Sequence, residues 1–102
     1  MPSRAELQKI FKNILGNNNV YFQPPEDIKI SYPCILFRLN NPAINQANNK
    51  IYIYRNRYAV TIISKNPDDD LLKKFLEEFP YAMVSPRTIV NKLYHDNISI
   101  LY

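Results

Sequence analysis

The side chains that could do chemistry in this chain are few, and each has a simpler structural explanation. His95 is the only histidine, and Asp96 follows it directly. A general base needs a carboxylate that orients its ring, but neighbouring residues of a strand point to opposite faces. We therefore expect His95-Asp96-Asn97 to form a turn and not a catalytic pair. The only cysteine, Cys34, lies in the apolar run 33–39, so we expect a core side chain with a raised pKa.

The acidic run Asp68-Asp69-Asp70 raises the question of a metal site. Consecutive carboxylates point in different directions, and the surrounding segment lacks the ligand spacing and the glycine of a calcium loop. The run follows Asn66-Pro67. A capping Asn, a Pro at the first helical position and acidic residues in the first turn are typical of a helix start. The sequence predicts a helix that begins here, and no metal or cofactor site.

The strongest candidate for binding is a basic and aromatic run between positions 50 and 58. Such a run can bind single-stranded nucleic acid through charge and stacking, with Tyr58 among its aromatic residues. Alternation along a strand would instead place Tyr52 and Tyr54 on one face, and tyrosine-rich ribbons are common in protein interfaces. We favour a protein interface. Its candidate contact residues, with the preceding polar loop 40–49, are Asn40, Asn49, Lys50, Tyr52, Tyr54, Arg55 and Arg57.

A second candidate surface is the segment Val20-Tyr21-Phe22-Gln23-Pro24-Pro25-Glu26. Proline fixes its own φ and pushes the preceding residue toward extended geometry, so Gln23 should lie outside the helical region. We expect a rigid loop that enters the buried strand 33–39. Its candidate docking residues are Tyr21, Phe22, Pro24, Pro25 and Glu26.

The composition limits the class of protein. A chain of 102 residues corresponds to one domain, residues 1–102, and 46% hydrophobic with 22% charged residues indicates a folded protein. The net charge of +4 comes from scattered basic residues and permits an anionic partner without forming a basic tail. A single cysteine excludes an internal disulfide and indicates a reducing compartment. We expect no membrane span, no catalytic set and therefore no enzyme.

Periodicity predicts the elements that must position these residues. Apolar residues recur at helical spacing after Arg4 and predict a helix over 4–15 that ends at Gly16, the only glycine. A second helix should extend from Asn66 to Pro80, and residues 51–64 should form two strands or one bent strand. The remaining apolar segments, 83–84, 88–93 and 98–102, are expected to form two strands or one strand and a ragged segment. The predicted fold is α+β, a small single domain with a mostly antiparallel or mixed sheet flanked by two helices.

Several short motifs occur in a characteristic order. After Val20-Tyr21-Phe22-Gln23-Pro24-Pro25-Glu26 come Tyr32-Pro33-Cys34-Ile35, Asn49-Lys50 followed by Tyr52, Arg57-Tyr58-Ala59-Val60-Thr61 with Ile63, Asn66-Pro67-Asp68 and His95-Asp96. This ordered set resembles the tail terminator proteins, also called tail completion or tail-to-head joining proteins, of long-tailed phages and prophages. Family members often carry an arginine after Phe-Asp in the penultimate strand. Here the region reads Val84-Ser85-Pro86-Arg87 and keeps only Arg87.

The resemblance implies a lambda-type tail-terminator fold and a structural function without cofactor or small-molecule substrate. Such proteins form a ring, typically of six subunits, that caps the tail tube, ends its polymerisation and joins it to head-completion and neck proteins. The expected location is the head-proximal end of the virion tail, assembled in the host cytoplasm, with phage DNA near the lumen. The alternatives are another neck connector and a small nucleic-acid-binding protein.

Overall fold

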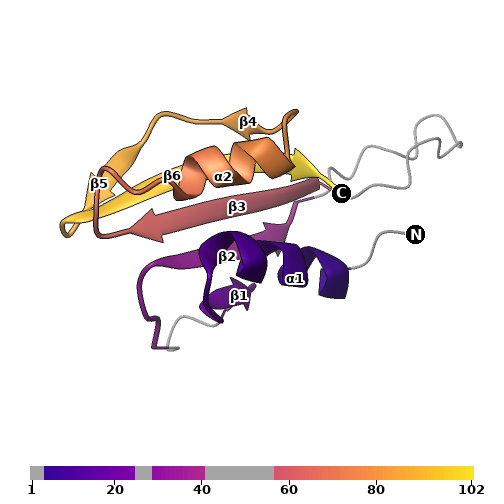
Figure 1. Cartoon of the computed structure of the whole chain (residues 1–102), viewed down its shortest axis with the longest axis horizontal. Coiled ribbons are helices and arrows are strands. Elements are labelled where there is room, and N and C mark those ends of the chain that lie inside the picture. Colours follow the sequence, from indigo (N-terminus) through magenta and orange to yellow (C-terminus); the bar gives the residue numbers. More distant parts are fainter. Residues whose placement is uncertain (1–3, 25–28, 41–56) are drawn as a thin grey trace, which may run out of the picture.

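The computed structural model describes residues 4–24, 29–40 and 57–102, and over these residues the predicted α+β fold is confirmed. One mixed sheet of six strands packs with two helices (Figure 1). In chain order the elements are α1 (Arg4–Leu15), β1 (Val20–Phe22), β2 (Cys34–Leu39), β3 (Arg57–Ser64), α2 (Leu71–Glu78), β4 (Met83–Val84), β5 (Thr88–Val90) and β6 (Leu93–Leu101).

The sheet has the order β1-β2-β3-β6-β4, and β5 also pairs with β6. β1 runs parallel to β2, and the other pairs are antiparallel. The pairing of β3 with β6 occupies one side of β6 from Tyr94 to Leu101. β4 and β5 therefore share the other side of β6, with Met83 opposite Ser99 and Thr88 opposite His95. Together they form an interrupted edge of the sheet.

Both helices cover the same face of the sheet (Figure 1). Phe11 of α1 lies at the centre of this layer, with its ring centroid 5.0 Å from that of Phe37 and 5.5 Å from that of Phe75. On β3 the side chains of Val60 and Ile62 join this core. Since alternate residues of a strand point to opposite faces, the residues between them face away from the helices. The second face of the sheet has no helix over it among the described residues.

The first predicted helix and strand are confirmed. α1 ends at Leu15, and Gly16 follows with a φ of +81°, the left-handed conformation that glycine adopts at low cost. The Gly16 N–H donates to the Lys12 carbonyl at 2.8 Å and closes the last turn. The strand expected over 33–39 is β2, and it lies in the interior of the sheet between β1 and β3.

The predicted start of the second helix is wrong by one turn. α2 begins at Leu71, so Pro67 does not occupy the first helical position and Asn66 does not cap the helix. Instead, the Asn66 side-chain oxygen accepts from the Asp68 N–H at 2.9 Å, and the Asp69 carboxylate accepts from the Leu71 N–H at 3.0 Å. These local bonds satisfy a turn that precedes the helix, which is a common alternative use of Asn and Asp.

The turn predicted at His95-Asp96-Asn97 is also wrong, because β6 runs through these residues without interruption. The chain reverses instead at Asn91 and Lys92, whose φ values are +53° and +64°. Two consecutive residues with positive φ are what a tight hairpin turn of this hand requires, and Asn tolerates that conformation well. The polar residues at 95–97 belong to the two faces of a strand and not to a loop.

The expected aromatic-proline loop differs from the prediction at its beginning. Residues 20–22 form the edge strand β1, in which Tyr21 lies opposite Leu36. Gln23 lies outside the right-handed helical region as expected, but its φ of +44° is left-handed and not extended. Its N–H donates to the Phe37 carbonyl at 2.8 Å and ends the pairing. Pro25 and Glu26, like the choice of one or two strands over 51–56, lie outside the described residues.

Candidate functional site

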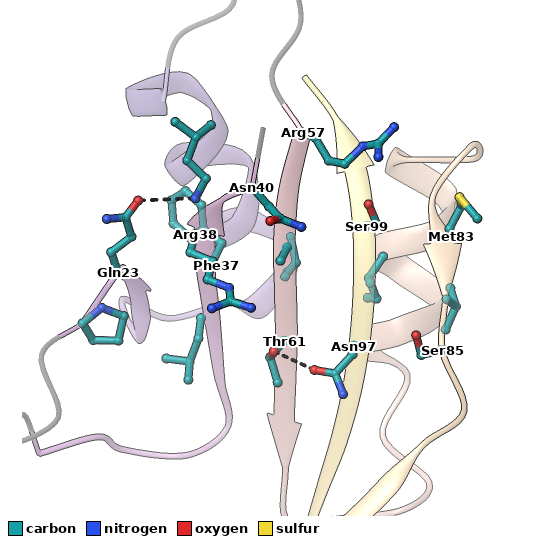
Figure 2. A pocket seen from close by; sticks show the side chains of 17 residues that line it. Gln23, Phe37, Arg38, Asn40, Arg57, Thr61, Met83, Ser85, Asn97 and Ser99 are labelled. Carbon is teal, nitrogen blue, oxygen red and sulfur yellow. Dashed lines mark hydrogen bonds between the residues drawn. The ribbon is translucent and has the colours of Figure 1, made fainter. Parts of the chain in front are cut away.

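The open face of the sheet forms a broad groove of about 1010 Å³ (Figure 2). Its floor consists of side chains from β2, β3 and β6, and β4 and the Gln23-Pro24 segment border it. Register places the floor residues in rows, because Leu36 pairs with Thr61 and Thr61 with Asn97, while Arg38 pairs with Ala59. The groove is thus built by the sheet pairing itself.

The groove is hollow because its floor side chains are short. Ala59, Thr61 and Ser99 project from the middle strands, and because these side chains are short, the surface of the sheet is recessed there. At the border, the longer side chain of Met83 is 75% exposed. The strand alternation that sends large apolar residues of β3 and β6 to the helices leaves the small and polar ones here.

The groove is basic and rich in hydrogen-bond donors. Arg38 and Arg57 both line it, and no Asp or Glu within residues 4–24, 29–40 and 57–102 is part of the lining. The Thr61 hydroxyl donates to the Asn97 side-chain oxygen at 2.9 Å, and the Leu39 N–H donates to the Gln23 side-chain oxygen at 3.4 Å (Figure 2). These bonds use the amide oxygens as acceptors, so the two amides present their NH₂ groups as donors.

The interrupted edge formed by β4 and β5 exposes large apolar side chains. Tyr81 is 95% exposed, Met83 75% and Ile89 63%, and Val84 and Val90 add to the same edge. The backbone is also open there. Ser85 donates its N–H to the Asn97 carbonyl at 2.9 Å, and hydrogen-bonded residues alternate in an antiparallel pair, so the N–H and C=O of Val84 point away from β6.

A bidentate ion pair between Arg87 and Asp96 fixes the segment between β4 and β5. The Arg87 guanidinium donates from Nε to Asp96 Oδ1 at 3.0 Å and from Nη2 to Asp96 Oδ2 at 2.9 Å. Its Nη1 donates to the Pro67 carbonyl at 3.1 Å. The bonds to Asp96 raise the pKa of Arg87 above its usual value, and the Asp96 side chain is only 3% exposed. Arg87 therefore ties β6 to the turn before α2 and has a structural role.

Cys34 and His95 do not form a pair. Cys34 is fully buried, and burial raises the pKa of its thiol to about 11, as the sequence predicted for a core cysteine. Cys34 lies opposite Ile63, and Ile63 lies opposite His95. Cys34 and His95 are therefore two strand spacings apart, which is roughly 10 Å. Asp96 faces the other side of the sheet from His95 and is paired with Arg87.

The structure brings together only some of the predicted interface residues. Asn40 donates its N–H to the Arg57 carbonyl at 2.8 Å, and both residues line the groove with Pro24. Phe22 is half-buried, with its ring centroid 5.0 Å from Phe37. Tyr21 is half-buried beside it in β1. Outside the described residues lie Pro25, Glu26, Asn49, Lys50, Tyr52, Tyr54 and Arg55.

One part of the nucleic-acid hypothesis is corrected. Tyr58 is only 4% exposed, and its ring centroid lies 5.9 Å from Phe37 within the core. It therefore cannot stack on a base. Arg38, Thr61 and Asn97 also line the groove, and no motif in the sequence singled them out. The alternation of small or polar with large apolar residues over 57–62 is the signal that could have found the open face.

Among the described residues no group of three His, Cys, Asp or Glu side chains is placed to hold a metal ion. No helix in the described ranges has the length and apolar character needed to cross a bilayer. Comparison with known proteins gave no match: no family model fits the chain, and no curated protein or solved structure matches it.

Proposed function

We propose that this protein is a virion structural protein, the tail terminator at the head-proximal end of a long phage tail. In this role its subunits form a six-membered ring that caps the tail tube, ends tube polymerisation and joins the tail to head-completion and neck proteins. It acts without a cofactor, a small-molecule substrate or a catalytic step. The apolar edge formed by β4 and β5 is the observation that best supports the proposal that this chain is a subunit of an assembly.

That edge has the properties of an interface. Tyr81, Met83 and Ile89 are all more than half exposed, and grouped apolar side chains on a small domain mark contact surfaces. The outward N–H and C=O of Val84 add a backbone template for pairing. Because the chain must keep such a surface from aggregating, coverage by a fixed partner is a physical explanation for it.

The sheet order supplies a second requirement of a ring. A closed ring of identical subunits uses heterologous contacts, in which two different patches of one subunit meet. The described sheet ends in β1 on one side and in the β4–β5 edge on the other, so the two ends differ in sequence and in exposure. The ordered motifs that resemble tail terminators support the choice of this particular assembly.

Measuring the mass of the purified full chain, first alone and then with tail tubes, tests the proposal. We expect a species six times the 12.0 kDa subunit, or ring formation on tube ends. A monomer whose mass changes only with DNA would favour the nucleic-acid-binding alternative. Electron microscopy of labelled virions provides the second test, and a label at the portal or in the capsid shell would contradict the terminator assignment.

A separate variant tests the hypothesis that the basic and aromatic run between positions 50 and 58 contributes to the ring contacts. Arg57 lies at the start of β3 and Arg55 just before the described segment. Charge reversal of both, Arg55→Glu and Arg57→Glu, is expected to impair ring assembly and tail joining. Unchanged assembly would remove this ribbon from the ring contacts and leave the β4–β5 edge as the candidate.

A further inference from the structure

We propose that Pro86-Arg87 forms a β-bulge that stops the β4–β5 edge from pairing with an extended strand of a second copy of this chain. The device lies on the edge that the proposed function uses, but it acts in the free subunit and does not require a ring. Three features of the edge support it: its register, its few open backbone groups, and the ion pair that fixes the bulge.

The register shifts by one residue between β4 and β5, which follow one another along β6 (Figure 1). Just after β4, the Ser85 N–H donates to the Asn97 carbonyl at 2.9 Å. At the start of β5, Thr88 lies opposite His95. Only one residue of β6 lies between these two partners, whereas the edge inserts two, Pro86-Arg87. Two residues opposite one is the arrangement that defines a β-bulge.

Around β4 the edge offers few backbone groups to a new strand. Every second residue of an antiparallel pair turns its N–H and C=O away from its partner, which here applies to residues 82, 84 and 86. The Ala82 N–H is already used, because it donates to the Phe79 carbonyl at 3.1 Å. Pro86 has no N–H. Among these three residues, only Val84 can both donate and accept.

On β5 the outward groups are out of phase with Val84. Asn91-Lys92 form a two-residue hairpin turn, so the pair that closes the turn, Val90 and Leu93, is hydrogen-bonded. By alternation, the N–H and C=O of Ile89 point outward. Val84 and Ile89 are an odd number of positions apart, whereas the outward groups of a regular strand are an even number apart. A strand that pairs at Val84 therefore cannot continue in register to Ile89.

The ion pair of Arg87 holds the bulge in place. The guanidinium donates twice to the carboxylate of Asp96, the residue opposite the bulge, and once to the Pro67 carbonyl at 3.1 Å. Bulges and proline are common means of blocking edge-to-edge pairing. A sheet that grew by strand addition would give an open filament in place of a closed assembly. The edge thus keeps its apolar side chains for contact, while its backbone permits only short bridges.

Removing the bulge tests this device directly. Deletion of Pro86 leaves Arg87 alone opposite Asp96 and brings β4 and β5 into one phase. We expect this variant to pass from discrete species into polymers that bind thioflavin T, as measured by sedimentation and fluorescence. Pro86→Val restores only the N–H and keeps the bulge, so it should polymerise more than the unmodified chain and less than the deletion variant. The matched control is Pro80→Val, at an exposed proline between α2 and β4, which should not polymerise.

Hydrogen exchange of the ¹⁵N-labelled, unmodified chain tests the bulge without any variant. The Ser85 and Thr88 amides should both be protected, because both bond to β6, and the Arg87 amide should exchange rapidly. A regular strand would instead protect Arg87 and leave Thr88 open. Circular dichroism and thermal unfolding show whether the deletion variant folds. If it does not, the exchange pattern and Pro86→Val decide.

Three outcomes would overturn the proposal. These are a folded deletion variant that stays as discrete as the unmodified chain, polymers of the Pro80→Val control, and protection of Arg87 in place of Thr88. None of them bears on the ring, because the mass of the unmodified chain on tube ends is measured separately. Conversely, if the unmodified chain forms no ring and the deletion variant still polymerises, the bulge assignment stands and the proposed function fails.

Discussion

The two faces of one sheet differ sharply, although the same strands build them. On β3, Tyr58, Val60 and Ile62 are at most 4% exposed under the helices, while Arg57 and Ala59 line the groove on the other side. The covered face is defined by large apolar side chains that interlock with α1 and α2. The open face is defined by small and polar side chains that cover little. Stability is thus concentrated on one face, and the other is available for contacts.

The largest expected effect is the loss of an aromatic ring from the covered face. Phe11→Ala removes a fully buried ring that contacts Phe37, Phe75 and Phe79. We expect the free energy of unfolding to fall by about 3–5 kcal/mol, from lost burial and the cavity left behind.

Urea unfolding followed by circular dichroism measures this effect, and Thr61→Ala on the open face is the matched comparison. Thr61 is only partly buried, so its loss should cost about 1 kcal/mol or less. Similar costs for the two variants would break the contrast between the faces.

The second effect concerns the ion pair that fixes the β4–β5 segment on the covered side. Arg87→Met leaves Asp96, with its 3% exposed side chain, without its guanidinium partner. Breaking a buried pair in this way costs up to about 5 kcal/mol, but the Arg87 side chain is 30% exposed, so we expect about 2–3 kcal/mol.

Lys74→Met provides the control, because the pair of Lys74 with Asp70 is exposed and its N–O distance is 3.6 Å. Its loss should cost at most about 0.5 kcal/mol in the same unfolding assay. If both variants behave alike, Arg87 is not the tie between β6 and the turn before α2.

A smaller effect should appear at Cys34, which points away from the helices and is nevertheless fully buried. Burial raises the pKa of its thiol from 9.0 to about 11. The folded state then holds the thiol proton more tightly than the unfolded state. The part of the unfolding free energy that depends on a protonated Cys34 is therefore fully present below pH 9 and is lost as the pH rises through 11.

Native-state alkylation of Cys34 at pH 8 should be about a hundredfold slower than in urea, from the thiolate fraction alone. Cys34→Ala should flatten the alkaline decline in unfolding free energy between pH 9 and 11. Rapid alkylation of the folded protein would show that the open face extends to this end of β2.

The smallest effect on the fold is expected at the β4–β5 edge. Met83→Lys with Ile89→Lys replaces side chains that are 75% and 63% exposed, so the stability of the subunit should change by less than about 0.5 kcal/mol. The same variant should abolish ring formation as measured by mass, because lysine at a sheet edge opposes pairing. Tyr81→Ser is a useful further variant at this edge. A ring that persists would move the contact to another surface.

Local signals in the sequence were sufficient for much of the fold. The helical period of α1 and the position of Gly16 define the first helix, and the apolar run ending at Leu39 defines β2. They succeed because periodicity and special backbone conformations are properties of neighbouring residues. The burial of Cys34 follows from the same run.

Where the local signals were ambiguous, the predictions from the sequence were wrong. Asn66 serves a turn and not a helix cap, and the hairpin reverses at Asn91-Lys92 in place of residues 95–97. In both cases the same residue types suit two conformations. For residues 95–97, the pairing of β6 with β3 on one side and β5 on the other selects the strand. Polar residues in a strand look like a turn until their partners are known.

The sequence by itself determined the α+β class, the core stripe of α1 and the cap at Gly16, because these depend on residues that are close in the chain. Only the tertiary structure decided that Arg87 holds Asp96, that β4 and β5 share one edge of β6, and that the rows of β2, β3 and β6 form a basic groove. These features join segments far apart in the chain. Their geometry follows from strand order and register, which local pattern does not specify.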